Sequence, residues 1–353
     1  MTDPTFCSFV LEIFYLGITT GTTPTTYDPS ASVSRLQMSA FLSRGVDGVL
    51  KRGSRRAALA RFWTPQTLST IATTTVGALP RAVKSDGVDL WVANFGDLSV
   101  SRVRGADGLL LQTWTGALGA FGVLTAMNRV FVTGFMTPGA LYRIDPTLAP
   151  GAVTTVATNL GGTPSGIDFD GSRIWTANLA GNSVSIVTPG ATLPWTVTTV
   201  TTGFAAPAGV VFDGANVWVT DNSAGKVYKL DANGSILQTV TVGGGPGNLM
   251  YDGTSLWVPN SGSGTVSVVR ASSGALLATL TGNGLMGATT AAFDGERILV
   301  TDFGGNRVSL WKAADLSPLG FISTGPSTQP GGACSDGVSF WVALQGTGQL
   351  ARF

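Results

Sequence analysis

The chain has 353 residues, of which 12% are charged and 48 are glycine, and its formal net charge is +1. Sparse charge and abundant glycine are typical of an all-β protein with many tight turns, and the length allows one large and one small domain. The near-zero net charge gives no electrostatic reason for a nucleic-acid partner, so we expect none.

The first segment, residues 1–17, has apolar residues at helical spacing, which predicts a short helix ending at Gly17. It contains Asp3 and Glu12 and has no Lys or Arg before its apolar stretch, which is not typical of a secretory signal. No stretch of about 18 residues is apolar enough to span a bilayer, so we expect no transmembrane segment. If the protein is exported, the true N-terminus lies upstream of Met1.

Residues 27–43 carry the signals of a second short helix. Tyr27-Asp-Pro29 predicts a turn, and Ser34 and Gln37 form a capping box that starts a helix at Arg35. The capping box places the side chain of Arg35 in the exposed first turn of this helix.

Together, "LGITTG" and "YDPSASVSRLQMSAFL" resemble an S-layer homology (SLH) module. The positions that match the family pattern are Gly17, Ile18, Gly21, Tyr27, Pro29, Val33, Ser34 (for Thr), Arg35, Gln37 and Met38. The resemblance implies cell-wall polysaccharide as the partner and Arg35 as the ligand contact. A single module is visible, whereas the family commonly uses three. The alternative is therefore that the module is purely structural and Arg35 a solvated residue.

A basic segment follows, with six Lys and Arg residues between Arg44 and Arg61 against one acid, Asp47. It is interpreted either as a patch for an anionic polymer or membrane surface, or as a solvated linker helix packed on the next domain. The predicted domains are the helical module at 1–44, the linker at 45–66 and a repeat domain at 67–353.

One motif recurs through the repeat domain. "FDGSRIWTANLAGNSVSIV" from Phe169 returns as "FDGANVWVTDNSAGKVYKL" from Phe212 and "YDGTSLWVPNSGSGTVSVV" from Tyr251. Counting a degenerate copy at Met127, seven units recur at intervals of 39 to 43 residues. Each unit contains four short strands, and in all but the degenerate copy an Asp-Gly turn lies between the first two. This pattern predicts a β-propeller of seven four-stranded blades, because a single blade cannot bury both faces of its sheet.

The ring is expected to close through its N-terminal strand. The last unit stops at Phe353, after its third strand, while "TIATTTVG" from Thr70 matches the missing fourth strand. We therefore predict that residues 70–76 pair with the strand that contains Leu350. The expected fold is an all-β, seven-bladed propeller preceded by a small α-helical module.

The repeats resemble a known family in their second strands. Trp91-Val-Ala-Asn94, Trp175-Thr-Ala-Asn178 and Trp257-Val-Pro-Asn260 are similar to the Tyr-Val-Thr-Asn (YVTN) repeats of bacterial surface-layer propellers. They are also similar to NHL propellers and to the streptogramin (virginiamycin B) lyases. The resemblance covers roughly residues 67–353 and implies the fold, whereas such propellers host many functions.

The second strands of five units end in polar side chains that are expected on one face of the propeller: Asn94, Asn178, Asp221, Asn260 and Asp302. Their oxygens could coordinate Ca²⁺ or hydrogen-bond a sugar. The alternative is that they bond to the backbone of neighbouring turns. We expect no other metal or cofactor. The tryptophans that recur at one strand position are expected to pack between blades.

The chain contains no histidine, which excludes Ser-His-Asp and Cys-His triads and imidazole bases. The streptogramin lyases are understood to use a histidine base, so the resemblance does not extend to that mechanism. We predict a non-catalytic, monomeric bacterial cell-surface protein whose propeller binds a protein or carbohydrate. The alternatives are a carboxylate- or Ca²⁺-dependent lyase or lactonase, and an intracellular scaffold.

Overall fold

The computed structural model describes Met38, Phe41 and residues 72–353. Met38 and Phe41 have helical backbone and lie inside the segment expected to be helical at 35–43. The rest of the predicted helical module and the basic linker lie outside the described residues, so both stay predictions. The chain divides into two units, Met1–Thr67 and Leu68–Phe353, and the second is the propeller.

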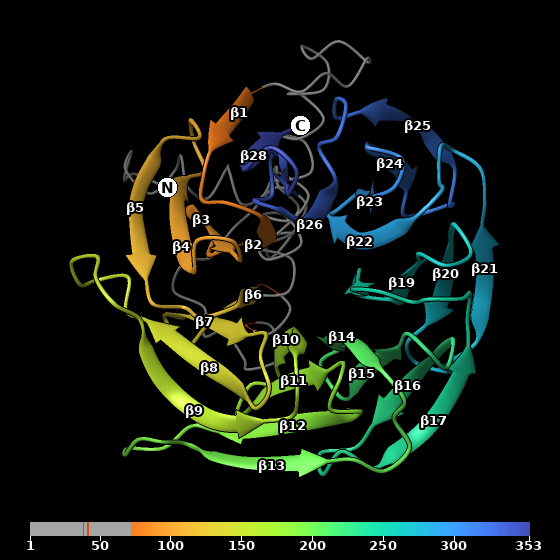
Figure 1. Ribbon diagram of the computed structural model, residues 1–353. Coiled ribbons are helices and arrows are strands. Elements are labelled where there is room, and N and C mark those ends of the chain that lie inside the picture. Colours follow the sequence, from red (N-terminus) through yellow and green to blue (C-terminus); the bar gives the residue numbers. More distant parts are fainter. Residues whose placement is uncertain (1–37, 39–40, 42–71) are drawn as a thin grey trace, which may run out of the picture. The chain divides into compact units, whose positions relative to one another are not determined.

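Seven four-stranded antiparallel sheets form the ring, as predicted, with the first strand of each blade innermost and the fourth at the rim (Figure 1). Blades 1 and 2 consist of β2 (Pro80–Ser85), β3 (Asp89–Asn94), β4 (Ser99–Arg104), β5 (Leu110–Thr115), β6 (Ala120–Ala126), β7 (Arg129–Gly134), β8 (Gly139–Ile144) and β9 (Thr154–Leu160). Blades 3 and 4 consist of β10 (Pro164–Phe169), β11 (Ile174–Asn178), β12 (Ser183–Thr188), β13 (Thr196–Val200), β14 (Pro207–Phe212), β15 (Val217–Asp221), β16 (Lys226–Leu230) and β17 (Ile236–Thr241).

Blades 5 and 6 consist of β18 (Met250–Tyr251), β19 (Ser255–Asn260), β20 (Thr265–Arg270), β21 (Leu276–Leu280), β22 (Ala288–Phe293), β23 (Arg297–Asp302), β24 (Arg307–Lys312) and β25 (Pro318–Ser323). Blade 7 consists of β26 (Pro330–Ser335), β27 (Phe340–Leu344), β28 (Gln349–Arg352) and β1 (Ala72–Thr75). Strand β1 pairs with β28 and sets Thr74 opposite Leu350, which confirms the predicted closure of the ring. No helix in this part of the chain has the length and apolarity needed to cross a bilayer.

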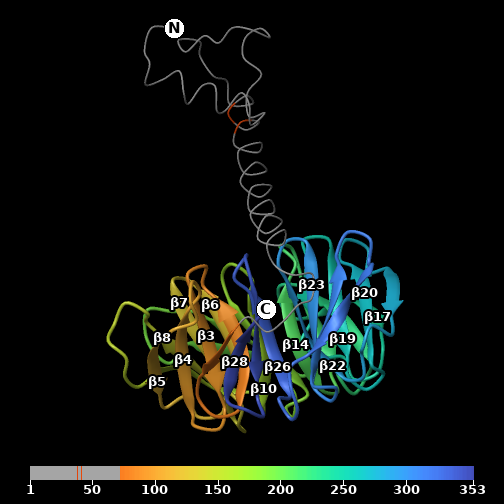
Figure 2. The ribbon, with the colours of Figure 1, turned by 90° about the horizontal axis from the view of Figure 1, so that it is seen from above.

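The two faces of the ring, seen edge-on in Figure 2, are defined by the first hairpin of each blade. In six blades the first residue of the first strand pairs with the last residue of the second, as Pro80 does with Asn94. In blade 5 the isolated bridge between Pro246 and Asn260 takes the place of this pair. We call this side the Asn/Asp face, after Asn94, Asn178, Asp221, Asn260 and Asp302. The hairpin turns lie on the other side, the Asp-Gly face, and carry Asp86, Asp170, Asp213, Asp252, Asp294 and Asp336.

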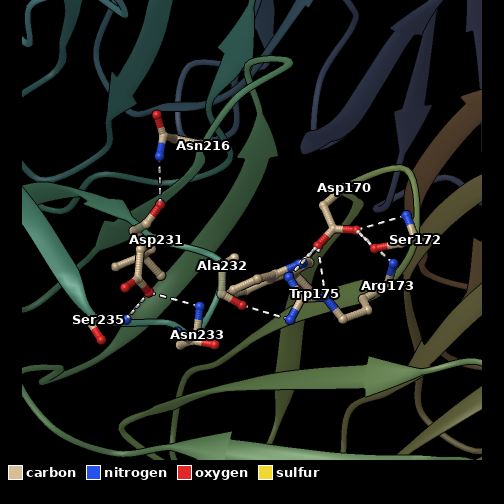
Figure 3. Close-up of polar contacts among 10 residues, drawn as sticks. Asp170, Ser172, Arg173, Trp175, Asn216, Asp231, Ala232, Asn233 and Ser235 are labelled. Atoms are coloured by element: carbon tan, nitrogen blue, oxygen red, sulfur yellow. Dashed lines mark hydrogen bonds and ion pairs between the residues drawn. The ribbon is translucent and has the colours of Figure 1, made fainter.

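A repeated contact joins the Asp-Gly turn to the blade core. In blade 3, Asp170 accepts hydrogen bonds from the Ser172 and Arg173 backbone N–H groups at 2.8 and 2.6 Å, and from the Trp175 indole Nε1 at 2.7 Å (Figure 3). The same indole-to-carboxylate bond measures 2.7 to 2.8 Å in the pairs Asp86–Trp91, Asp213–Trp218, Asp252–Trp257 and Asp336–Trp341. The tryptophans therefore hold the turn to the sheet while filling the core.

These tryptophans are at most 1% exposed and pack between neighbouring blades. Trp91, for example, lies with Val123 and Val132 of the next blade in one apolar cluster. An indole buries roughly 200 Å², which at about 25 cal/mol per Å² contributes on the order of 5 kcal/mol. The predicted packing role is confirmed.

Candidate functional site

The polar residues predicted at the strand ends lie where expected, at the last residue of the second strand of their blades. All five are 0% exposed: Asn94, Asn178, Asp221, Asn260 and Asp302. Each belongs to a separate sheet, so the ring does not gather them into one site. Arg35, the predicted polysaccharide contact, lies outside the described residues.

The three asparagines each donate to two hydroxyls on the third strand of their own blade. Asn178 Nδ2 donates to Ser183 Oγ at 3.1 Å and to Ser185 Oγ at 2.9 Å. Asn94 and Asn260 make the same pair of bonds to the residues at the same positions, Ser99 with Ser101 and Thr265 with Ser267. A Ser/Thr-Val-Ser sequence after the turn is thus the signal that accompanies an amide at the strand end.

The two aspartates instead accept bonds from loop N–H groups. Asp221 accepts from Ala205, Ala206 and Ala224 at 2.7 to 3.0 Å. Asp302 accepts from the N–H groups of Met286, Gly287 and Gly305. These carboxylates organise their own loops, and among the described residues no group of three or more Cys, Asp or Glu side chains is placed to hold a metal ion.

A central cavity of about 210 Å³ is lined by the first strands of all seven blades. The cavity is narrow because neighbouring first strands approach each other closely. A Cβ added at Gly166, for example, would lie 2.5 Å from the Ala208 carbonyl oxygen. The polar side chains on the wall include Arg81, Lys84, Asp168 and Asn248. The sequence pattern at the ends of the second strands, which gave the candidate residues of the propeller, did not predict any of these four.

At the Asn/Asp face one cation sits among three aromatic rings, and we name Arg81, Phe95, Phe121 and Phe135 the Arg81 cluster. The Arg81 guanidinium carbon lies 5.4 Å from the centre of the Phe95 ring and 5.6 Å from that of Phe121. The rings of Phe121 and Phe135 stack at 4.5 Å with 17° between their planes, and Phe95 meets both edge-on. Arg81 and Phe121 also line the cavity.

The Arg81 guanidinium has no acidic partner among the described residues. Its Nε is buried without a hydrogen-bond partner among the described residues, and no ion pair there includes it. Asp97, in the loop after Phe95, instead accepts from the Ala78 N–H and the Ser99 hydroxyl. Desolvation by burial lowers the pKa of Arg81 from its usual value.

Nearer the Asp-Gly face the cavity wall carries Lys84 and Asp168. Lys84 is exposed, and Asp168 accepts a 2.7 Å bond from the Phe212 N–H. Burial raises the pKa of the Asp168 carboxyl, although Lys84 acts in the opposite direction. Cys334, in the same layer, is buried, and desolvation raises the pKa of its thiol to about 12, so it is not an activated nucleophile.

No protein-family model and no curated protein matches the chain. Solved structures do match it. A catalytically inactive histidine-to-alanine variant of virginiamycin B lyase from Staphylococcus aureus, with quinupristin, is 16% identical, with a TM-score of 0.66 over 80% of this chain and 98% of that one. A streptogramin B lyase (14% identity, TM-score 0.66, 80% and 96% covered) and the WD40 propeller domain of Doa1 (14%, 0.66, 80% and 95%) are also similar. At these identities the likeness shows the propeller fold alone.

Proposed function

We propose that this chain is a non-catalytic binding protein of the bacterial cell surface, whose propeller takes a ligand at its central cavity. The observation that carries the proposal is the Arg81 cluster, a partly buried cation that has aromatic neighbours and, in the described part of the chain, no acidic partner. An uncompensated charge is costly in a desolvated site, and a bound ligand of opposite charge offsets that cost. The cluster therefore favours binding at the Asn/Asp end of the cavity.

The arrangement of titratable groups supports binding rather than turnover. The chain has no histidine, and in the described cavity wall no hydrogen bond joins two titratable side chains. Asp168 accepts from a backbone N–H, and the Tyr251 hydroxyl donates to the Gly253 carbonyl at 2.7 Å. A nucleophile activated by an adjacent base requires such a side-chain pair.

Quinupristin is the direct test, because a structurally similar lyase variant was crystallised with it. The purified protein is incubated with quinupristin, alongside an active streptogramin B lyase as the positive control, and the products are resolved by mass spectrometry. We expect intact quinupristin. Cleavage of quinupristin by this chain would overturn the non-catalytic proposal.

One observation favours the second candidate, a carboxylate-dependent lyase or lactonase. Asp168 combines a raised pKa with a place on the cavity wall and an exposed lysine on the same wall, Lys84. Perturbed carboxyls in cavities are candidate general bases. If turnover of a lactone is found, Asp168→Asn should abolish it. Turnover that survives this substitution would remove Asp168 from the mechanism.

Attachment to cell-wall polysaccharide is the part of the proposal that rests on the SLH-like sequence and its Arg35. The test is co-sedimentation of the full chain with purified sacculi, comparing wild type, Arg35→Ala and the control Arg270→Ala, which alters an exposed arginine of β20. We expect only Arg35→Ala to reduce pelleting, and wild-type pelleting to fall as salt rises, because screening shortens the reach of exposed charges. Equal pelleting of all three proteins would leave the module without a binding role.

A further inference from the structure

Resting on the binding role proposed above, we infer that the Arg81 cluster binds a small organic acid, with its carboxylate on Arg81 and its apolar ring on Phe121 and Phe135. Both parts of this ligand follow from the geometry. The guanidinium needs an acceptor, and the stacked phenyl rings beside it are only partly buried and offer an apolar surface.

The acceptor is best supplied as a planar carboxylate. A guanidinium presents its N–H groups as a rigid fork that matches two carboxylate oxygens. The rings of Phe95 and Phe121 already lie against Arg81, at 5.4 and 5.6 Å, and they hold the side chain in place before a ligand arrives. A fixed cation loses less side-chain entropy on binding than a free one.

A single negative charge suits the site better than a phosphate dianion. Arg81 is the one cation of the cluster, and Lys84 follows it three residues later on β2, roughly 10 Å away along an extended strand. A second charge on the ligand would therefore lie in a desolvated site without a partner.

The size and walls of the cavity limit the ligand further. Its volume of about 210 Å³ is below the roughly 300–1,000 Å³ of pockets for drug-sized molecules, which favours a single ring with a short acidic chain. Across the seven first strands, the residue at the position of Arg81 and Phe121 is small in the other five: Ser165, Ala208, Gly247, Thr289 and Gly331. Recognition is thus confined to the side of blades 1 and 2.

The probe is 3-phenylpropionate, titrated into the full chain by isothermal calorimetry, with 3-phenylpropanamide and phenyl phosphate as comparison ligands. We expect the acid to bind with a Kd in or below the millimolar range, and the amide and the phosphate to bind at least tenfold more weakly. This ligand comparison needs no protein variant and is independent of folding.

Protein variants then place the site. Arg81→Met should weaken binding of the acid by roughly tenfold to a hundredfold, the effect of losing a charged hydrogen-bonded partner, and Arg81→Lys should lie between it and wild type. Arg143→Met is the matched control, since Arg143 also lies over an aromatic ring, that of Trp195 at 5.8 Å, but not on the cavity wall. We expect it to bind like wild type.

Equal binding of acid and amide, no binding of the acid, or unchanged binding by Arg81→Met would each overturn the inference. These outcomes leave the non-catalytic part of the proposed function standing, because quinupristin turnover tests that part separately. Conversely, selective binding of the acid together with cleavage of quinupristin would retain this inference and remove the non-catalytic function.

Discussion

Two serines at the same position of the third strand should respond differently to removal of their hydroxyls. Ser267 and Ser309 are both 0% exposed. Ser267 Oγ accepts from Asn260 Nδ2 at 3.0 Å and from the Gly243 N–H at 3.4 Å. Ser309 Oγ is buried and has no hydrogen-bond partner within the described residues. Blade 6 ends its second strand in Asp302 in place of an asparagine, and the Asp302 carboxylate accepts from the N–H groups of its own loop.

We expect Ser267→Ala to lower the free energy of unfolding by about 1–2 kcal/mol, since it removes an acceptor from two buried donors. Ser309→Ala removes a hydroxyl that is already unsatisfied, so stability should stay unchanged or rise by up to about 1 kcal/mol. The assay is urea unfolding followed by tryptophan fluorescence, with midpoints compared at equal slope. Equal shifts of both midpoints in the same direction would refute the reasoning.

Three other expectations concern closure, the cavity wall and acid stability. Deleting residues 1–76 removes β1 and leaves β28 as an open edge; we expect aggregation in size-exclusion chromatography, and a monomer melting like the full chain would contradict this. Gly166→Ala should lower the free energy of unfolding by about 2 kcal/mol in a urea titration, because the added Cβ would meet the backbone of the next blade. The control Gly151→Ala, whose Cβ would have nothing within 4 Å, should change the free energy of unfolding little, and equal losses for both variants would contradict this reasoning. The pKa of Asp170 is lowered to about 2 because hydrogen bonds from Trp175 and the turn outweigh desolvation, so its stabilisation is present above about pH 4 and is lost as pH falls towards 2. Asp170→Asn should lower the urea midpoint at pH 7 and flatten its decline between those pH values, and an unchanged decline would speak against the assignment.

The fold was predictable because its determinants are local and repeated. Asp and Trp recur five residues apart in five units. The closed ring was therefore predictable from the interval between the units and from the absence of a fourth strand after Phe353. What the spacing did not predict is the hydrogen bond from each indole to its turn aspartate. The strand alternation predicts that the tryptophans are buried, but not that the carboxylate reaches back across the hairpin.

The central site was harder to predict because its residues come from segments that differ between units. Arg81 and Phe121 occupy the same position of adjacent first strands, 40 residues apart. Aligning the seven first strands at their starting residues would have found them, because Arg81 and Phe121 are the two large side chains at the second position. The contact with Phe95 and Phe135 depends on how the loops after the second strands fold towards the axis. No local sequence pattern predicts the conformation of these loops.

Residues that repeat in register between blades and residues that differ between blades have different roles. A residue repeated in register, such as Asn178, meets nearly the same surroundings in several blades, and there it is buried and bonded within its own sheet. A ligand without sevenfold symmetry can be oriented only by positions at which the blades differ, and Arg81, Lys84 and Asp168 are such positions on the cavity wall. It follows that Asn178→Ala should act on stability and Arg81→Met on binding. The proposed binding role therefore rests on the first strands of blades 1 to 3, which carry Arg81, Lys84, Phe121 and Asp168 on the cavity wall.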